Sequence, residues 1–266
     1  MTEQTYTYRD STLNLNQAGN YTLLVQVNNK SFDYAVIDHG TMVACETNCK
    51  LEELTQPDQL YAQLNADYKN VVIGLSATGF TFIPTELFDA EHTADIAKLL
   101  DVKDNENVLT QPLDADNYVV YKTDKQLIAS VTLLDIKNIV FAPKGWLTAI
   151  ERSSPSNGYL FLNFEEEQVE FAYYKGNKLR FYNKFDFANL EELIYYTLLV
   201  SKELELKQQN TTLVVSGNIT TGDAQYTILT QYYSNVRLNT IETVELPDDI
   251  RSQQILSLSA LYLCAL

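Results

Sequence analysis

The sequence predicts an α/β protein in which one unit of strands and helices occurs twice. The first copy runs from a strand and glycine turn at 32–40 into the helical 51–54, and the second runs from 169–176 into 190–193. Each copy is followed by an apolar run that contains a glycine, at 71–75 and 213–217. Such a run is typical of a strand buried on both faces. An internal repeat of this kind fixes the architecture before any single residue does.

The first half of the chain follows a polar, turn-rich lead-in segment over 1–20. Alternating or continuous apolar runs predict strands, and apolar residues three or four apart predict helices. Strands are expected at 21–27, 32–38, 42–46, 71–75, 80–83, 118–121 and 139–141, and helices at 51–64, 85–100, 124–134 and 145–150. Pro84 ends a strand, and Thr85 is the expected cap of the helix that follows it.

The second half begins after the clearest break in the chain, the serine-, proline- and glycine-containing segment 153–158. This break predicts a first half over 21–154 and a second half over 155–266. In the second half, strands are expected at 159–164, 169–174, 178–185, 212–215 and 236–238, and helices at 189–206, 224–233 and 249–266.

Composition excludes several classes of function. The net charge of −16 repels nucleic acid, whose binding depends on lysine and arginine, and disfavours an anionic membrane surface. Met1–Gln4 lacks the basic start and apolar stretch of a signal peptide, and the apolar run at 255–266 is too short to span a bilayer. Three cysteines is an odd count for a disulfide framework. We therefore expect a cytoplasmic protein.

The predicted order of elements is that of the ribonuclease-H-like half-fold: three antiparallel strands, a helix, a buried parallel strand, a helix and a further strand. Two such halves in tandem define the actin and sugar-kinase superfamily. The segment Gly79–Phe88, GFTFIPTELF, resembles the F-T-L-V-P-x-x-L-F segment of a bacterial family of unknown function, number 3822. The resemblance spans about 21–266 and implies an actin-like ATPase fold without an established activity. The second half is also similar to bacterial pilus-assembly and division proteins of actin type.

The resemblance places ATP between the halves, with an Asp-x-Gly turn in each half to receive phosphate and, through water, magnesium. Here the first turn, 27–31, has neither aspartate nor glycine, and the second carries three glutamates. Each like-charge pair about 4–6 Å apart costs about 3–4 kcal/mol at an effective dielectric of about 20. If nucleotide binds at all, the residues that remain for it are Lys30, Ser216 and Gly217.

Other site chemistry is weakly supported. A metal site from His39, Cys45 and Cys49 is disfavoured because residues four apart on a strand lie too far from each other to share a metal. A nuclease of the ribonuclease H class would need several carboxylates and a basic groove, and neither is evident. The sequence therefore predicts no catalytic residue and no metal ligand.

Tyrosines crowd the second half, and tyrosine is enriched at protein interfaces. We expect an interaction surface there, next to an exposed edge strand at 178–185 and formed by Tyr173, Tyr174, Glu165, Glu166 and Glu167. The leading hypothesis is a non-catalytic interaction or scaffold protein without a cofactor, a degenerate relative of the actin-like ATPases that binds another protein or a second copy. The alternative is an active ATPase or kinase that binds ATP and magnesium through altered phosphate loops.

Overall fold

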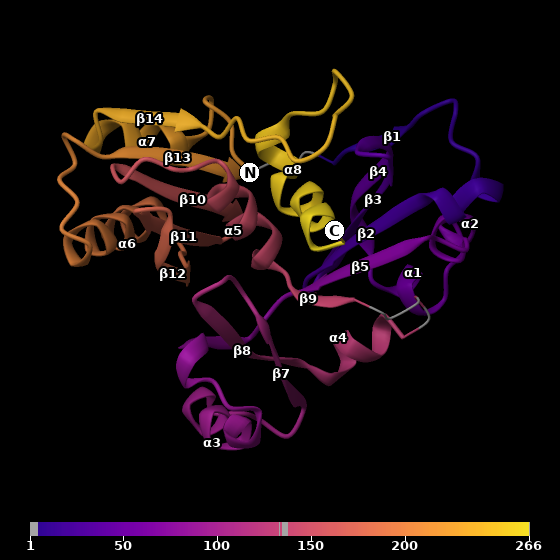
Figure 1. Ribbon diagram of the computed structural model, residues 1–266. Coiled ribbons are helices and arrows are strands. Elements are labelled where there is room, and N and C mark those ends of the chain that lie inside the picture. Colours follow the sequence, from indigo (N-terminus) through magenta and orange to yellow (C-terminus); the bar gives the residue numbers. More distant parts are fainter. Residues whose placement is uncertain (1–4, 133, 135–137, 266) are drawn as a thin grey trace. The chain divides into compact units, whose positions relative to one another are not determined.

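The computed structural model describes residues 5–132, 134 and 138–265, and these form two compact units (Figure 1). The N-terminal unit contains 5–148, 243–245 and the segment from 257 onward. The C-terminal unit contains 149–242 and 246–256. The division differs from the predicted one, because the chain returns to the N-terminal unit after it has built the C-terminal unit.

The larger sheet of the N-terminal unit is mixed. Its order is β1 (Thr7–Arg9), β4 (Thr41–Lys50), β3 (Ser31–Asp38), β2 (Tyr21–Val27), β5 (Asn70–Leu75) and β9 (Ile139–Phe141). The neighbours β2, β3 and β4 are antiparallel, whereas β5 and β9 continue the sheet in parallel, with Leu24 opposite Val72. Apolar side chains on one face pack against α1 (Glu52–Thr55), α2 (Tyr61–Leu64) and α4 (Lys125–Ser130). The turn η5 (Leu261–Cys264) contacts β2 and β5, and a Cβ on Gly74 would meet the Leu261 side chain at 3.1 Å.

The sheet of the C-terminal unit repeats this order. It runs β12 (Lys178–Asp186), β11 (Gln168–Lys175), β10 (Tyr159–Glu165), β13 (Thr212–Gly217) and β14 (Asn235–Leu238), and again the first three are antiparallel and the last two parallel. One face packs against α6 (Leu190–Glu203) and α7 (Ala224–Tyr232). The predicted strands 71–75 and 212–215 thus occupy matching central positions, and the expected duplication is confirmed.

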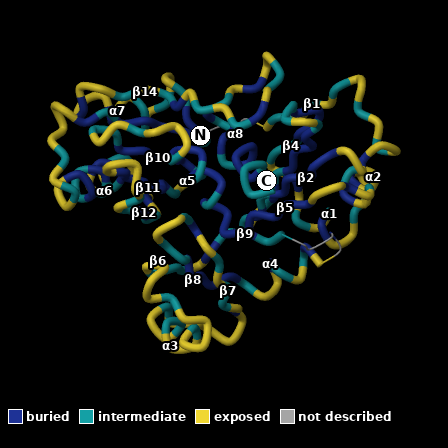
Figure 2. The backbone as a smooth tube through the Cα atoms, viewed as in Figure 1, coloured by how far each residue is buried: buried dark blue, intermediate teal, exposed yellow. Residues whose placement is uncertain are grey.

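A smaller sheet interrupts the first repeat between β5 and α4. It consists of β6 (Gly79–Pro84), β8 (Asn117–Asp124) and β7 (Glu106–Pro112), all antiparallel. The segment between β6 and β7 forms short helical turns: η2 (Thr85–Leu87), η3 (Ala90–His92), α3 (Thr93–Ala97) and η4 (Lys98–Leu100). We call residues 79–124 the small lobe. Figure 2 shows the central strands of the two larger sheets mostly buried and the α3 region of the small lobe mostly exposed.

Several predicted elements differ from the structure. The helix expected at 51–64 is two short helices with Pro57 between them, because proline lacks the N–H that a continuous helix needs. The helix expected at 85–100 is broken as well, and the Asp89 side chain accepts a hydrogen bond from the backbone N–H of Glu91 in its middle. The strands β1 and β7 were not predicted. The closing helix is shorter than expected, as α8 (Ser252–Ala260) followed by η5.

The remaining helix, α5 (Pro143–Arg152), crosses α8 very closely at Gly145. A Cβ on Gly145 would lie 2.7 Å from the backbone carbonyl of Ala260. This contact holds residues 257–265 within the N-terminal unit, where Leu258, Ala260 and Leu261 are buried.

Candidate functional site

The first turn, between β2 and β3, is closed by the side chain of Asn28. Its Oδ1 accepts hydrogen bonds from the backbone N–H groups of Lys30, at 2.8 Å, and Ser31, at 2.9 Å. The N–H of Asn28 donates to the carbonyl of Ser31 at 3.0 Å. Backbone N–H groups of this kind are what a phosphate binds in a turn. In this turn they already have acceptors inside the protein, and Lys30 lies on the exposed side of the same turn.

The second turn, between β10 and β11, carries its negative charge at the end of the sheet. Glu165 closes β10 opposite Gln168, and Glu166 holds a left-handed backbone conformation with φ of 46°. Glu165 and Glu166 are half-buried and Glu167 is exposed. A triphosphate at this turn would meet carboxylates in a partly desolvated setting, where repulsion between like charges is stronger than in water.

The end of β13 lies beside this turn, but its polar groups are also occupied. Gly217 pairs with Phe164, and at φ of 83° a Cβ would lie 2.2 Å from the Phe164 carbonyl oxygen. Glycine is therefore required here for the close approach of two strands. The Ser216 hydroxyl is fully buried and donates to Asn163 Oδ1 at 3.2 Å.

The three amides that follow Gly217 all have internal acceptors. Asn218 N donates to the carbonyl of Phe164 at 2.8 Å, Ile219 N to that of Gly217 at 2.7 Å, and Thr220 N to Asp223 Oδ2 at 2.7 Å. This loop therefore presents no set of converging backbone donors to a phosphate. Sequence reasoning missed this loop, although an acidic residue three positions after a threonine can accept from the backbone N–H of that threonine.

A buried polar network joins the same strand ends to the edge of the sheet. Asn163 Nδ2 donates to Glu170 Oε2 at 2.8 Å, and the Tyr182 hydroxyl donates to Glu170 Oε1 at 2.6 Å. All three side chains are at most 7% exposed. Burial, followed by the nearby Glu170 carboxylate, raises the pKa of Tyr182 well above its ordinary value, so the hydroxyl stays a donor. Each oxygen of the carboxylate has a donor, as buried charge requires.

The predicted interaction surface at Tyr173 and Tyr174 is wrong. Tyr173 is 7% exposed and packs in the core beneath α6, while Tyr174, next to it on β11, is 2% exposed. Successive strand residues point to opposite faces, and both faces of this sheet are covered at this position, so neither ring reaches solvent. The prediction that 178–185 is an edge strand is confirmed, because β12 ends the sheet.

The cysteines considered as metal ligands are buried thiols. Desolvation is the main cause that raises the pKa of the Cys45 thiol to about 12. Desolvation is also the main cause that raises the pKa of the Cys49 thiol, and it raises it further. His39 is exposed and its Nδ1 contacts Asp38. Among residues 5–132, 134 and 138–265, no three His, Cys, Asp or Glu side chains gather as a metal site would require.

One further polar side chain lies at the strand ends of the C-terminal unit. Asn239 follows β14, is 2% exposed, and uses its backbone N–H for the carbonyl of Val215 and its Oδ1 for the N–H of Ile241. Its Nδ2 has no acceptor within the described part of the chain. A buried amide without an acceptor is unusual in native proteins. Sequence reasoning did not single out this residue.

The repeated strand order and the two turns at equivalent positions define the class of the protein: it has the actin-like ATPase fold, made of two ribonuclease-H-like halves. At the phosphate turns of that fold, the first turn here has backbone N–H groups that already have acceptors, and the second carries three glutamates. The chain belongs to the family described as "Protein of unknown function (DUF3822)", whose model matches residues 10–236. The resemblance inferred from the segment at 79–88 is thereby confirmed.

Solved structures show that other proteins share this fold. A protein from Bacteroides thetaiotaomicron with an actin-like ATPase fold and unknown function is 17% identical, with a TM-score of 0.78 over 96% of this chain and 100% of that one. The PilM–PilN type IV pilus biogenesis complex contains a chain that is 11% identical, with a TM-score of 0.63 over 92% of this chain and 97% of that one. No curated protein matches the sequence. In the part of the chain that the structure describes, no helix is long and apolar enough to cross a membrane.

Proposed function

We propose that this chain is a non-catalytic interaction or scaffold protein of the cytoplasm, with an actin-like ATPase fold whose phosphate turns no longer serve nucleotide. The observation that carries the proposal is the turn at Asn28, whose side-chain oxygen takes the two backbone N–H groups of Lys30 and Ser31. A phosphate would have to break these hydrogen bonds, and its own contacts would have to offset the free energy that they contribute. The internal acceptors of Asn218, Ile219 and Thr220 at the end of β13 support the same conclusion.

Protein binding is the function that this fold can serve without nucleotide chemistry. PilM, which shares the fold, is found in a complex with PilN. The chain's acidic surface, with a net charge of −16, favours a protein partner over nucleic acid. We extend protein binding to this chain on these two grounds.

The proposal is tested by calorimetric titration of the purified protein with magnesium-ATP, together with thermal denaturation at millimolar ATP. An active actin-like ATPase, titrated in the same buffer, is the positive control. We expect no heat of binding and no change in melting temperature, because a ligand at concentration c that binds the folded state stabilises it by RT ln(1 + c/Kd), which vanishes when c is far below Kd. Dissociation in the low micromolar range, or a rise of several degrees, would refute the proposal.

The alternative is an ATPase or kinase that binds ATP and magnesium through altered loops. It is favoured by one observation, the buried Nδ2 of Asn239 at the carboxyl end of β14. Ligands of open α/β sheets bind at the carboxyl ends of parallel strands, so an acceptor on a ligand could satisfy this amide. If the titration shows binding, an Asn239→Asp variant should weaken it, whereas an Asn235→Asp variant at the opposite, exposed end of β14 should not.

A further inference from the structure

The exposed aliphatic side chains of this protein are concentrated in one segment of the small lobe. Leu87 is 74% exposed, Leu99 is 76% exposed and Val102 is 38% exposed. Among the described residues, the other large hydrophobic side chains with comparable exposure are tyrosines: Tyr61, Tyr195 and Tyr232. Aliphatic groups have no polar end that would favour exposure, so a concentration of them marks a surface that a partner covers.

Leu87 and Leu99 are exposed, whereas the helical turns that carry them are packed against the sheet on their inner side. The helical turns over 85–100 cover one face of the small-lobe sheet: α3 contacts β8, η4 contacts β6, and the Phe88 ring stacks on Tyr118 with centroids 4.0 Å apart. The half-buried positions of α3 and η4 recur at helical spacing, at Thr93, Ile96, Ala97 and Leu100. Leu87 and Leu99 fall outside this inward row. Both are therefore surplus to the packing of the lobe.

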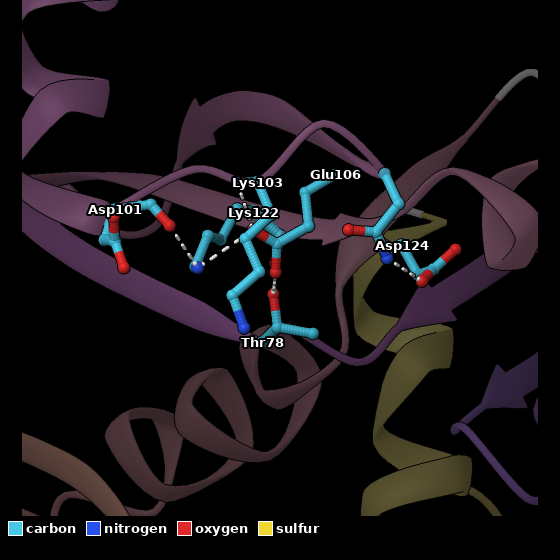
Figure 3. A network of polar contacts seen from close by, with 7 residues as sticks. Thr78, Asp101, Lys103, Glu106, Lys122 and Asp124 are labelled. Atoms are coloured by element: carbon cyan, nitrogen blue, oxygen red, sulfur yellow. Dashed lines mark hydrogen bonds and ion pairs between the residues drawn. The ribbon is translucent and has the colours of Figure 1, made fainter.

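The end of the layer is held rigidly by a buried ion pair (Figure 3). Lys122 Nζ lies 2.9 Å from Glu106 Oε2 and also donates to the backbone carbonyl of Asp101 at 2.9 Å. Glu106 Oε2 in turn accepts from the backbone N–H of Lys103 at 2.9 Å. The backbone on both sides of Val102 is thus held by hydrogen bonds to this pair. Groups held in place before binding lose less entropy when a partner binds.

The surroundings of these apolar groups are acidic. Within 85–102 the exposed carboxylates are Glu86, Asp89, Glu91, Asp95 and Asp101, against a single lysine, Lys98, which is paired with Asp95 at 2.6 Å. In the described structure, the carboxylates of Glu86 and Glu91 have no cationic partner. Exposed leucines among uncompensated carboxylates are complementary to a segment that is both apolar and basic.

We infer that the outer surface of residues 85–102, which we call the lobe surface, binds a cationic amphipathic helix of a partner protein. Leucines of the lobe surface would pack against the apolar side of that helix, and Glu86 and Glu91 would pair with its lysines or arginines. Binding of an amphipathic helix by an apolar surface with a charged rim is a recurrent mode of peptide recognition. This inference rests on the proposed function, names the chemistry of the partner, and moves the interaction surface away from Tyr173 and Tyr174.

The test uses a fluorescein-labelled synthetic helix of about 18 leucine and lysine residues, patterned to place the leucines on one side. Fluorescence anisotropy is measured with the full-length protein. We expect saturable binding that weakens about tenfold or more in a Leu87→Ser/Leu99→Ser variant, because burial of each leucine is worth a large part of a tenfold change in affinity. The matched control is Tyr61→Ser/Tyr232→Ser, which removes two exposed apolar side chains elsewhere and should bind as the wild type does.

Charge is tested separately, because any acidic protein attracts a basic peptide. A Glu86→Gln/Glu91→Gln variant should bind several-fold more weakly and lose part of the salt dependence of binding. A Glu203→Gln/Glu205→Gln variant removes two exposed carboxylates in the C-terminal unit and should change neither. Three results would each overturn the proposal that the lobe surface binds the helix. They are binding that the leucine variant leaves unchanged, binding that the control variants lose equally, and no binding by the wild type. None of these results affects the proposed function, which fails only if magnesium-ATP binds.

Discussion

Lys122 and Glu106 form an ion pair inside the small lobe, with Nζ 2.9 Å from Oε2 and side chains that are 9% and 5% exposed. The pair joins β8 to the start of β7, and its remaining hydrogen bonds hold the backbone at Asp101 and Lys103. The Thr78 hydroxyl donates to the other carboxylate oxygen. A buried pair of this kind adds little stability over an apolar pair of the same size, but the loss of one partner leaves an uncompensated charge.

Replacement of Lys122 by methionine should therefore lower the free energy of unfolding by about 3–5 kcal/mol. Urea denaturation measures this quantity. A Lys122→Met/Glu106→Gln variant should recover part of the loss, because it leaves no buried charge: the amide oxygen can still accept from the backbone N–H of Lys103, and the amide NH2 can donate to the Thr78 hydroxyl oxygen. This account is wrong if the double variant loses more free energy of unfolding than the Lys122→Met and Glu106→Gln variants lose together.

Acid should destabilise the protein through the same residue. Hydrogen bonds from Thr78 and from the backbone N–H of Lys103, opposed in part by desolvation and supported by Lys122, lower the pKa of Glu106 from its ordinary 4.5 to about 2. Because the pKa is lower in the folded state, the stabilisation is complete above pH 4.5 and is lost as the pH falls toward 2. Denaturation measured across this range should show a steeper loss for the wild type than for Glu106→Gln.

The hydroxyl of Tyr182 should contribute measurably to stability. In a Tyr182→Phe variant, Glu170 Oε1 loses the donor that lies 2.6 Å away, and the buried acceptor costs about 1–3 kcal/mol. Tyr195, 60% exposed on α6, provides the matched control, and Tyr195→Phe should change stability by less than about 0.5 kcal/mol. Equal effects of the two substitutions in thermal denaturation would show that the Glu170 carboxylate reaches water.

Gly217 should be far less tolerant of alanine than Gly176 is. Both residues have positive φ, 83° and 60°, but a Cβ on Gly217 meets Phe164 and Asn163, whereas a Cβ on Gly176 meets nothing within 4 Å. We expect the free energy of unfolding, measured by urea denaturation, to fall by about 1 kcal/mol in Gly176→Ala, from backbone conformation alone. In Gly217→Ala it should fall by about 3 kcal/mol. Similar losses would mean that the strand ends can separate to admit a methyl group.

Thiol reactivity should separate Cys264 from the other two cysteines. The thiolate is the reactive form, and burial raises the pKa of Cys45 to about 12 and that of Cys49 as well. At pH 8, a coloured disulfide reagent should therefore modify half-buried Cys264 first, and Cys45 and Cys49 only after denaturant is added. A Cys264→Ser variant should lose the early reaction; rapid modification of that variant would show that β4 opens.

The sequence could predict the larger sheets because their central strands are mostly apolar. Runs such as 71–75 and 212–215 have no other stable placement than between covered faces. The burial of the tyrosines was predicted wrongly because the ring of Tyr174 is amphipathic and suits a surface as well as a core. Tyr174 is buried because both faces of the sheet are covered there, and that covering depends on residues distant in the sequence.

The polar turns were harder to predict. The absence of glycine and aspartate near Asn28 is visible in the sequence, but the hydrogen bonds of Asn28 that close the turn depend on backbone geometry. In the small lobe, one continuous helix was expected over 85–100. The Asp89 side chain accepts a hydrogen bond from the backbone N–H of Glu91 where that helix is broken, and Leu87 and Leu99 are left exposed.

The close crossing of α5 and α8 at Gly145 has a consequence for the order of events during synthesis. Domains generally fold as units as they emerge, the first ones first. Here the segment from 257 onward belongs to the unit that was begun at residue 5, and Leu261 covers Gly74 in its central strand. The unit that is translated first is thus completed last. Until then, that face of its central strands stays uncovered, and transiently exposed apolar surface of this kind makes an incompletely folded chain prone to aggregate.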